Sequence, residues 1–194
     1  MKKTILFFTV LICGFAFGQD VFKYSSFKMD NSKKSYNMMV DYDKNKSIKK
    51  ILIDVESEDV LFDKASYIIR ENDLLKFTAY LSFILSKKME WDIINKNNKT
   101  KDVIKKIEWD LGDVLVNCVY TDGPVKINTY LYTMYTFSNN YSTVIISTAG
   151  SNDVKSSTIF FSSNILFENF IKKLDLDKIQ NAINIDASKK ELLK

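Results

Sequence analysis

The chain has 194 residues and a formal charge of +4 at pH 7, and it contains no histidine. Its lysine pairs are spread along the sequence rather than gathered in one block, which argues against a nucleic-acid-binding surface. Without histidine, serine and cysteine hydrolases lose their usual base and zinc sites lose a common ligand. The composition therefore lowers the expectation of an enzyme, and we expect no cofactor and no metal.

Residues 1–18 have the pattern of a secretory signal peptide. Lys2 and Lys3 form a basic start, Ile5–Ile12 is a short apolar run, and small residues precede an expected cleavage near Gly18/Gln19. The run is too short to span a membrane, so we expect no transmembrane anchor after cleavage. We predict a periplasmic or secreted protein exported across a bacterial inner membrane.

Cys13 offers a different interpretation of the same segment, as the lipidated cysteine of a lipoprotein. This is the weaker alternative, because Ile12 stands where that processing requires a small residue. Residues 19–194 are expected to form a single domain with a formal charge of +2, because Lys2 and Lys3 leave with the signal. Cys118 then has no cysteine partner, and its place in an alternating run predicts a small buried strand residue.

The part of the chain before residue 71 is expected to be extended. Alternation of apolar and polar residues is clearest at Tyr36–Tyr42, and the turn Asp43–Ser47 should lead into the returning strand Ile51–Val55. Further strands are expected at Val21–Met29, Val60–Phe62 and Ala65–Arg70, the last two with a short helix as the alternative.

Asp73–Asn95 is the one long segment with a firm helical pattern. Its large apolar side chains share one wide arc, which must be buried against neighbouring elements. The members of this arc are Leu74, Phe77, Tyr80, Leu81, Ile84, Leu85 and Trp91.

Extended segments follow this helix and are separated by short turns at residues 111–112, 122–124, 138–140 and 150–153. Neighbouring strands should therefore pair as an antiparallel meander. The expected strands are Val103–Asp110, Asp113–Thr121, Val125–Phe137, Tyr141–Thr148 and Val154–Ser162. Ser163 should cap a helix over Asn164–Leu174, and a short helix over Asp177–Ile185 should precede a polar, mobile tail from about residue 186. The predicted fold is α+β: a curved antiparallel sheet of about seven to nine strands on one long central helix, with a C-terminal helix.

Two acidic patterns in the sequence could form sites. Asp41, Asp43, Asn45 and Ser47 begin like a calcium loop, but Lys46 replaces the required glycine, so a hairpin turn is the better interpretation. Paired carboxylates could support a hydrolase of envelope or extracellular polymers. The candidates are Asp54, Glu56, Glu58, Asp59, Asp110 and Asp113.

The strand Val125–Phe137 carries bulky residues on both faces, with Tyr130 and Tyr132 on one of them. A curved sheet that holds a helix often leaves a pocket beside it, and tyrosines suit such a pocket because their hydroxyls stay hydrated. We therefore predict a ligand-binding site formed by Tyr80, Trp91, Tyr130 and Tyr132. The leading hypothesis is a non-enzymatic binding module for a small apolar molecule or an envelope protein, and the alternative is the carboxylate-based hydrolase.

Overall fold

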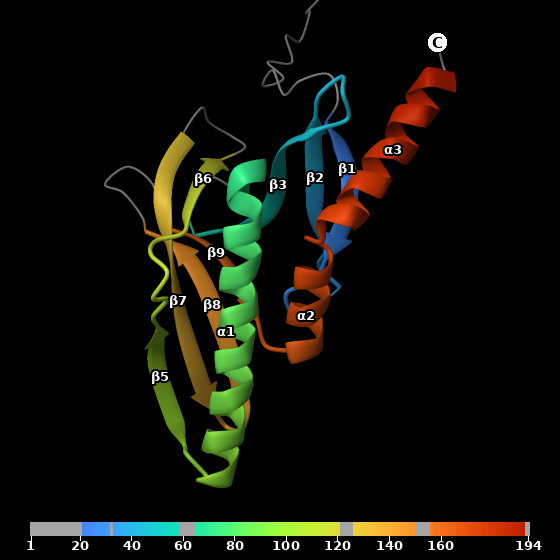
Figure 1. Cartoon of the computed structure of the whole chain (residues 1–194). Coiled ribbons are helices and arrows are strands. Elements are labelled where there is room, and N and C mark those ends of the chain that lie inside the picture. The colour runs from blue at the N-terminus through green and yellow to red at the C-terminus, as the bar shows by residue number, and fades with distance from the viewer. Residues whose placement is uncertain (1–20, 32, 59–64, 121–125, 150–155, 193–194) are drawn as a thin grey trace, which may run out of the picture.

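The computed structural model describes residues 21–31, 33–58, 65–120, 126–149 and 156–192. Within them the chain forms a nine-stranded antiparallel sheet with three helices, which confirms the predicted α+β class (Figure 1). The strands are β1 (Phe22–Phe27), β2 (Tyr36–Tyr42), β3 (Ile48–Ser57), β4 (Ala65–Arg70), β5 (Asp102–Ile107), β6 (Leu115–Tyr120), β7 (Lys126–Ser138), β8 (Tyr141–Thr148) and β9 (Ser157–Phe161). The helices are α1 (Glu71–Asn97), α2 (Asn164–Lys172) and α3 (Leu176–Leu192).

The sheet curls until its last strand meets an early one. Its order is β1-β2-β3-β4-β6-β7-β8-β9, and β9 also pairs with β3. This is possible because β3 is long: its first part pairs with β2 on one edge, and Glu56 and Ser57 at its end pair with β9. The strands from β3 to β9 therefore form a closed ring of pairings, apart from β5, which pairs only with β7.

The prediction that β5 and β6 pair as a hairpin is wrong. Both strands pair with the same edge of β7, β5 with the register Ile107↔Thr133 and β6 with Leu115↔Tyr130. Both strands run antiparallel to β7 and therefore run in the same direction as each other. They form one interrupted sheet edge, and the chain does not reverse between them as it would in a hairpin. The segment Glu108–Val114 leaves the sheet at this interruption and returns to it.

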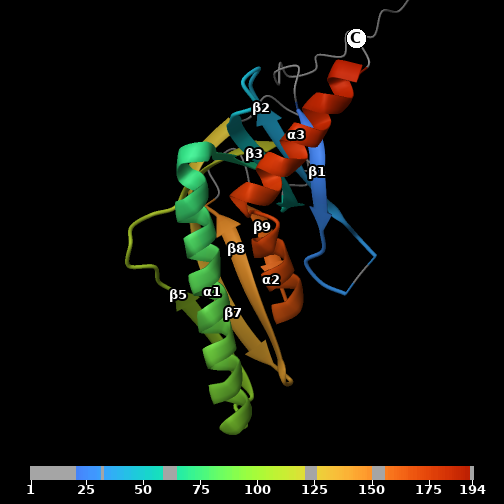
Figure 2. The ribbon, with the colours of Figure 1, turned by 45° about the vertical axis from the view of Figure 1, so that its right-hand side comes forward.

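Helix α1 crosses the face of β7 and β8, and α2 and α3 lie on the same side of the sheet (Figures 1 and 2). Its first half buries the predicted apolar side chains, from Leu74 to Ile84. Beyond Ile84 the buried positions keep the helical spacing but become polar, at Lys88, Asp92 and Asn95. The hydrophobic pattern gave no sign of this buried polar continuation.

The C-terminal region is more helical than expected. Ser163 caps α2 as predicted, because its hydroxyl accepts a hydrogen bond from the backbone N–H of Leu166. Helix α3, however, does not end at Ile185 but continues to Leu192. Its last turns pack on β2, where the Tyr42 hydroxyl donates to Asp186 at 2.8 Å and Lys190 lies over the Tyr42 ring.

Two predicted turns are confirmed. The carboxylate of Asp43 accepts the backbone N–H groups of Asn45 and Ser47, which closes the β2–β3 turn. Asn139 and Asn140 both have positive φ, the geometry that a two-residue hairpin requires. Cys118 is fully buried, as expected for a small strand residue.

Several predictions fall outside the described residues: the signal segment 1–18, Val60–Phe62, and the turns at residues 122–124 and 150–153. Within the described part of the chain, no helix combines the length and the apolar character needed to cross a membrane.

Candidate ligand-binding site

The segment Glu108–Val114 builds the candidate site because it detours over α1 instead of continuing the sheet edge. Trp109 turns toward α1 and packs edge-on against Tyr80 and Phe83, with ring centroids 5.8 and 5.1 Å apart. These contacts hold the detour against the helix. At the interruption between β5 and β6, these three aromatic side chains thus form a wall.

Polar contacts fix the C-terminal end of the detour. The Lys76 ammonium donates to the backbone carbonyl of Asp113 at 2.8 Å, and the N–H of Leu131 donates to the carbonyl of Val114 at 3.0 Å. Gly112 has φ +81°, a conformation that residues with a Cβ rarely adopt. The detour therefore depends on glycine at this position and on a lysine of α1.

A cavity of about 500 Å³ lies between this detour, α1 and β7. Its volume is within the range of small-molecule sites, roughly 300–1,000 Å³. Tyr80, Tyr130 and Tyr132 line it together with Trp109 and Leu131. We call this cavity the aromatic pocket; it brings together three of the four predicted ligand-binding residues.

The tyrosines of the aromatic pocket have different environments. Tyr80 is buried, and its hydroxyl shares a hydrogen bond of 2.6 Å with Thr133. Burial raises the pKa of Tyr80 despite this bond, so the hydroxyl stays protonated. Tyr130 and Tyr132 lie on the outer face of β7 and are 53% and 39% exposed. The site therefore has an ordered inner end at Tyr80 and accessible aromatic side chains at Tyr130 and Tyr132.

The indole of Trp109 has an unsatisfied donor. Its Nε1 atom is enclosed and has no hydrogen-bond partner in the described part of the chain. An enclosed polar group without a partner costs roughly 1–3 kcal/mol. A movement of the detour that gave this N–H an acceptor, on a ligand or in water, would recover that cost.

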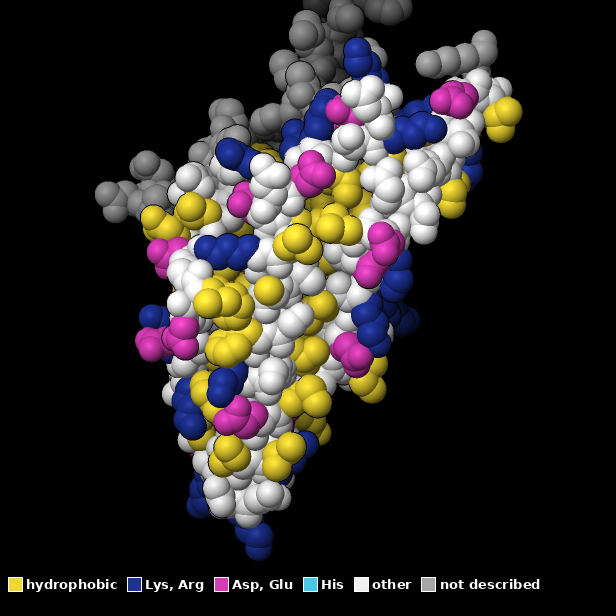
Figure 3. Space-filling view, viewed as in Figure 1, with side chains coloured by type: hydrophobic (Ala, Val, Ile, Leu, Met, Phe, Trp, Pro, Cys, Tyr) yellow, Lys and Arg dark blue, Asp and Glu magenta, His cyan; other side chains and the backbone are white. Residues whose placement is uncertain are grey.

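The mouth of the aromatic pocket is acidic. Glu108, Asp110 and Asp113 line the pocket. Lys106 is the one lysine among the described residues that line it, and its ammonium lies 3.6 Å from the carboxylate of Glu108. Figure 3 shows hydrophobic side chains beside α1 on this side of the molecule, with acidic and basic side chains among them. Negative charge around an apolar cavity disfavours anionic ligands and attracts cationic ones.

Trp91 does not belong to this pocket. It lies about 16 Å further along the helix axis than Tyr80. There it packs edge-on against Tyr135 at 5.2 Å, and the Lys105 ammonium lies 4.9 Å from the centre of its ring. Sharing a helix face was therefore not enough to place Trp91 beside Tyr80. Trp109, which the sequence analysis missed, takes its place.

The candidate catalytic carboxylates fall into two groups. Asp54 accepts hydrogen bonds from Asn37 and Ser66, Glu56 from Lys34 and Tyr36, and Glu58 from Ser156 and Thr158. Asp110 and Asp113 both line the aromatic pocket, whereas Asp59 lies outside the described residues.

Glu56 is unsuited to act as a general acid. Burial alone raises the pKa of Glu56, but hydrogen bonds from Lys34 and Tyr36 outweigh burial and lower it below its ordinary value. A catalytic acid needs the opposite shift. In the described part of the chain, no cluster of three or more Cys, Asp or Glu side chains could hold a metal ion.

Comparison with known proteins adds no identity: no protein-family model, curated protein or solved structure matches the chain.

Proposed function

We propose that the protein is an exported, non-enzymatic binding module that holds a small apolar ligand in the aromatic pocket. The observation that carries this proposal is the convergence of Tyr80, Trp109, Tyr130 and Tyr132 on one cavity of about 500 Å³. Aromatic side chains provide large contact areas with few rotatable bonds, which makes them efficient in ligand sites. The amino-terminal pattern of residues 1–18 supports export.

The charges around the mouth narrow the ligand class. An apolar molecule that is neutral or carries an amine would rest on the aromatic rings and meet the carboxylates of Asp110 and Asp113 at the mouth. A ligand with a carboxylate or phosphate group would be repelled there. A protein partner that inserts one apolar side chain beside Tyr130 and Tyr132 would use the same chemistry.

A carboxylate-based hydrolase is the second candidate, because Asp110 and Asp113 lie in the same pocket. This mechanism needs one carboxyl group as acid and the other as base or nucleophile. Incubation with cell-envelope polysaccharide and measurement of new reducing ends tests it. Hydrolysis that is lost in the Asp110→Asn/Asp113→Asn variant would establish the enzyme and contradict the binding module.

The binding proposal is tested with 1-aminoanthracene, an apolar fluorescent amine, and the mature protein. Saturable binding is expected, and Tyr130→Ala/Tyr132→Ala should weaken it by about 30-fold, since each aromatic contact is worth about 1 kcal/mol. Tyr141→Ala is the matched control, because Tyr141 is an exposed tyrosine of the neighbouring strand β8.

A second signal locates the bound probe. The chain has two tryptophans, so Trp91→Phe leaves Trp109 as the only indole fluorophore. Probe binding should quench Trp109 in this variant. Equal affinity of the wild type and the Tyr130→Ala/Tyr132→Ala variant, or unchanged Trp109 emission at saturation, would contradict the proposal.

A further inference from the structure

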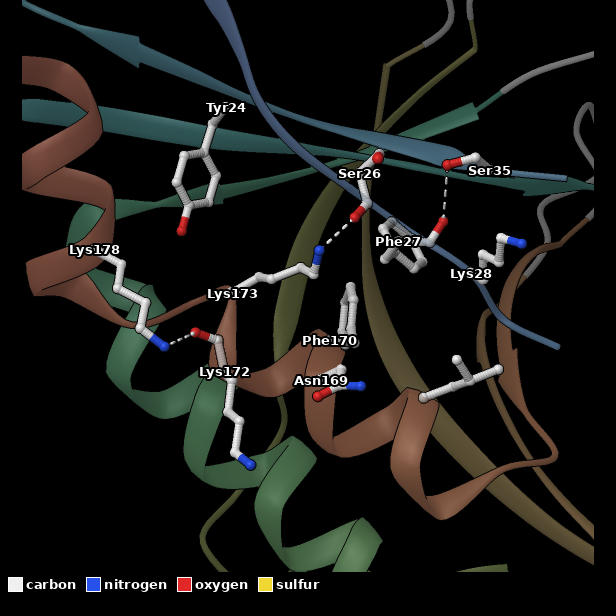
Figure 4. A pocket seen from close by; sticks show the side chains of 11 residues that line it. Tyr24, Ser26, Phe27, Lys28, Ser35, Asn169, Phe170, Lys172, Lys173 and Lys178 are labelled. Carbon is white, nitrogen blue, oxygen red and sulfur yellow. Dashed lines mark hydrogen bonds between the residues drawn. The ribbon is translucent and has the colours of Figure 1, made fainter. Parts of the chain in front are cut away.

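A second cavity, of about 570 Å³, lies away from the aromatic pocket. It is bounded by β1, by the segment that leads into β2, and by α2 and the start of α3 (Figure 4). Lys28, Lys172, Lys173 and Lys178 are among its lining residues, and none of the described residues that line it is acidic. We call this cavity the lysine pocket.

Lys172 is the one lining lysine that pairs with a carboxylate of the described chain, so the ammonium groups of Lys28, Lys173 and Lys178 have no such partner among the described residues. Lys173 is half-buried and donates to the carbonyl of Ser26 at 2.6 Å and to the hydroxyl of Ser25 at 3.2 Å. Lys178 donates to the carbonyl of Lys172 at 3.4 Å. These acceptors are neutral and do not balance the positive charges, and the serine contacts hold Lys173 in place (Figure 4).

The other two lysines contribute less. The Lys172 ammonium pairs with Glu168 at 2.6 Å, and its side chain points away from Lys173 and Lys178 in Figure 4. Lys28 is exposed at the far side of the cavity. The charge that a ligand would meet therefore comes first from Lys173 and Lys178.

Neutral donors and an apolar wall complete the cavity. The Tyr24 ring lies between Lys173 and Lys178, and burial, with the charge of Asp175, raises the pKa of Tyr24, so its hydroxyl remains a donor (Figure 4). Asn169 adds an amide, and Phe27 and Phe170 form the apolar part of the wall. Asp175 is an acidic neighbour of the cavity, and one of its carboxylate oxygens accepts the backbone N–H of Lys178.

We propose that the lysine pocket binds the phosphate group of an organic phosphate, with Lys173 and Lys178 contacting the phosphate oxygens. Two ammonium groups match the charge of a phosphate monoester better than that of a single carboxylate. The apolar wall favours a phosphate attached to a carbon skeleton over the inorganic ion. This site is independent of the aromatic pocket, whose acidic mouth selects the opposite charge.

The test is calorimetric titration of the mature protein with phenyl phosphate, with benzoate as the carboxylate control. Lys173→Met/Lys178→Met should weaken binding at least about tenfold, because hydrogen bonds to charged groups are strong. Lys44→Met/Lys101→Met removes the same charge from two exposed lysines outside the pocket and should leave affinity unchanged. Asn169→Asp changes an exposed residue, so it tests the site even if loss of Lys173 impairs folding; it should also weaken binding.

Flotation with phosphatidic acid vesicles, whose lipid headgroup is itself a phosphate monoester, distinguishes the two sources of such a group. Vesicle binding that needs the same two lysines, in addition to phenyl phosphate binding, assigns the pocket to a lipid headgroup. Phenyl phosphate binding alone assigns it to a soluble phosphate. The proposal is overturned if phenyl phosphate does not bind, if benzoate binds as tightly, if vesicles bind without phenyl phosphate, or if both double variants lose affinity equally.

Discussion

Replacing Asp92 by alanine should destabilise the protein by about 3–5 kcal/mol, the cost of leaving a buried charge without its partner. The Lys88 ammonium lies 3.0 Å from Asp92, and the Lys88 side chain is only 1% exposed. Without Asp92, the one remaining acceptor of this ammonium among the described residues is the Ser142 hydroxyl, at 2.6 Å. Burial already lowers the pKa of Lys88, and the Asp92 carboxylate opposes that shift.

Removing Lys88 instead of Asp92 should lower the free energy of unfolding by a smaller amount. In Lys88→Met, Asp92 keeps hydrogen bonds from the Tyr135 hydroxyl at 2.9 Å and from Asn164 at 3.4 Å. Its side chain is also 10% exposed, so water can reach it. The double variant Lys88→Met/Asp92→Leu removes both charges and should recover most of the loss, because apolar replacements of a buried pair are often neutral.

Urea unfolding followed by circular dichroism measures these free energies. The matched control is Glu90→Ala, which breaks the exposed pair Lys87–Glu90 on the same helix and should cost less than about 1 kcal/mol. A loss of unfolding free energy in Asp92→Ala no larger than in Glu90→Ala would contradict this prediction. So would a loss in the double variant equal to the sum of the two single losses.

Three further predictions concern the turns, the caps and alkaline pH. Gly112→Ala should lower the free energy of unfolding by about 1 kcal/mol, because Gly112 has a positive φ. It should also weaken 1-aminoanthracene binding by more than this loss of stability explains. Ser163→Ala should lower the free energy of unfolding by about 1 kcal/mol through the lost cap of α2, measured in urea. Burial raises the pKa of Tyr135 to about 12, so its contribution to stability is complete below pH 10 and is lost between pH 10 and about 12. In Tyr135→Phe, the urea midpoint should therefore decrease less steeply between pH 10 and about 12 than in the wild type. An equal slope in the two proteins would contradict this.

The sequence was informative where one local pattern determines the structure. The alternation in Tyr36–Tyr42 predicted β2, and the turn residues Asn139 and Asn140 predicted the β7–β8 hairpin. The apolar arc of Asp73–Asn95 predicted α1 and its buried face. In these segments, burial of one face and the backbone preferences of single residues act in the same direction.

The sequence was less informative where distant segments combine. The β5–β6 interruption could not be distinguished from a hairpin, because both use short polar connections around a glycine. Trp109 therefore went unnoticed, although its position just before Gly112 was a usable signal. The buried polar residues in the second half of α1 were not predicted, because charged residues such as Lys88 and Asp92 are usually exposed. Their partners, Tyr135 and Ser142, lie on distant strands and are known only from the structure.

The lysine pocket shows the same limit more strongly. Lys28, Lys173 and Lys178 come from parts of the chain that meet only when α2 and α3 pack against β1. In the sequence they are three members of an evenly spread lysine population. Only the tertiary structure separates them from the others.

Native mass spectrometry of the protein purified from its native host tests the central claim most directly. The aromatic pocket predicts a reproducible extra mass that is lost on denaturation. The same adduct should remain on Tyr141→Ala and be absent from Tyr130→Ala/Tyr132→Ala. A bare wild-type mass, or an adduct that the pocket variant retains, would contradict the proposal that these tyrosines hold a ligand.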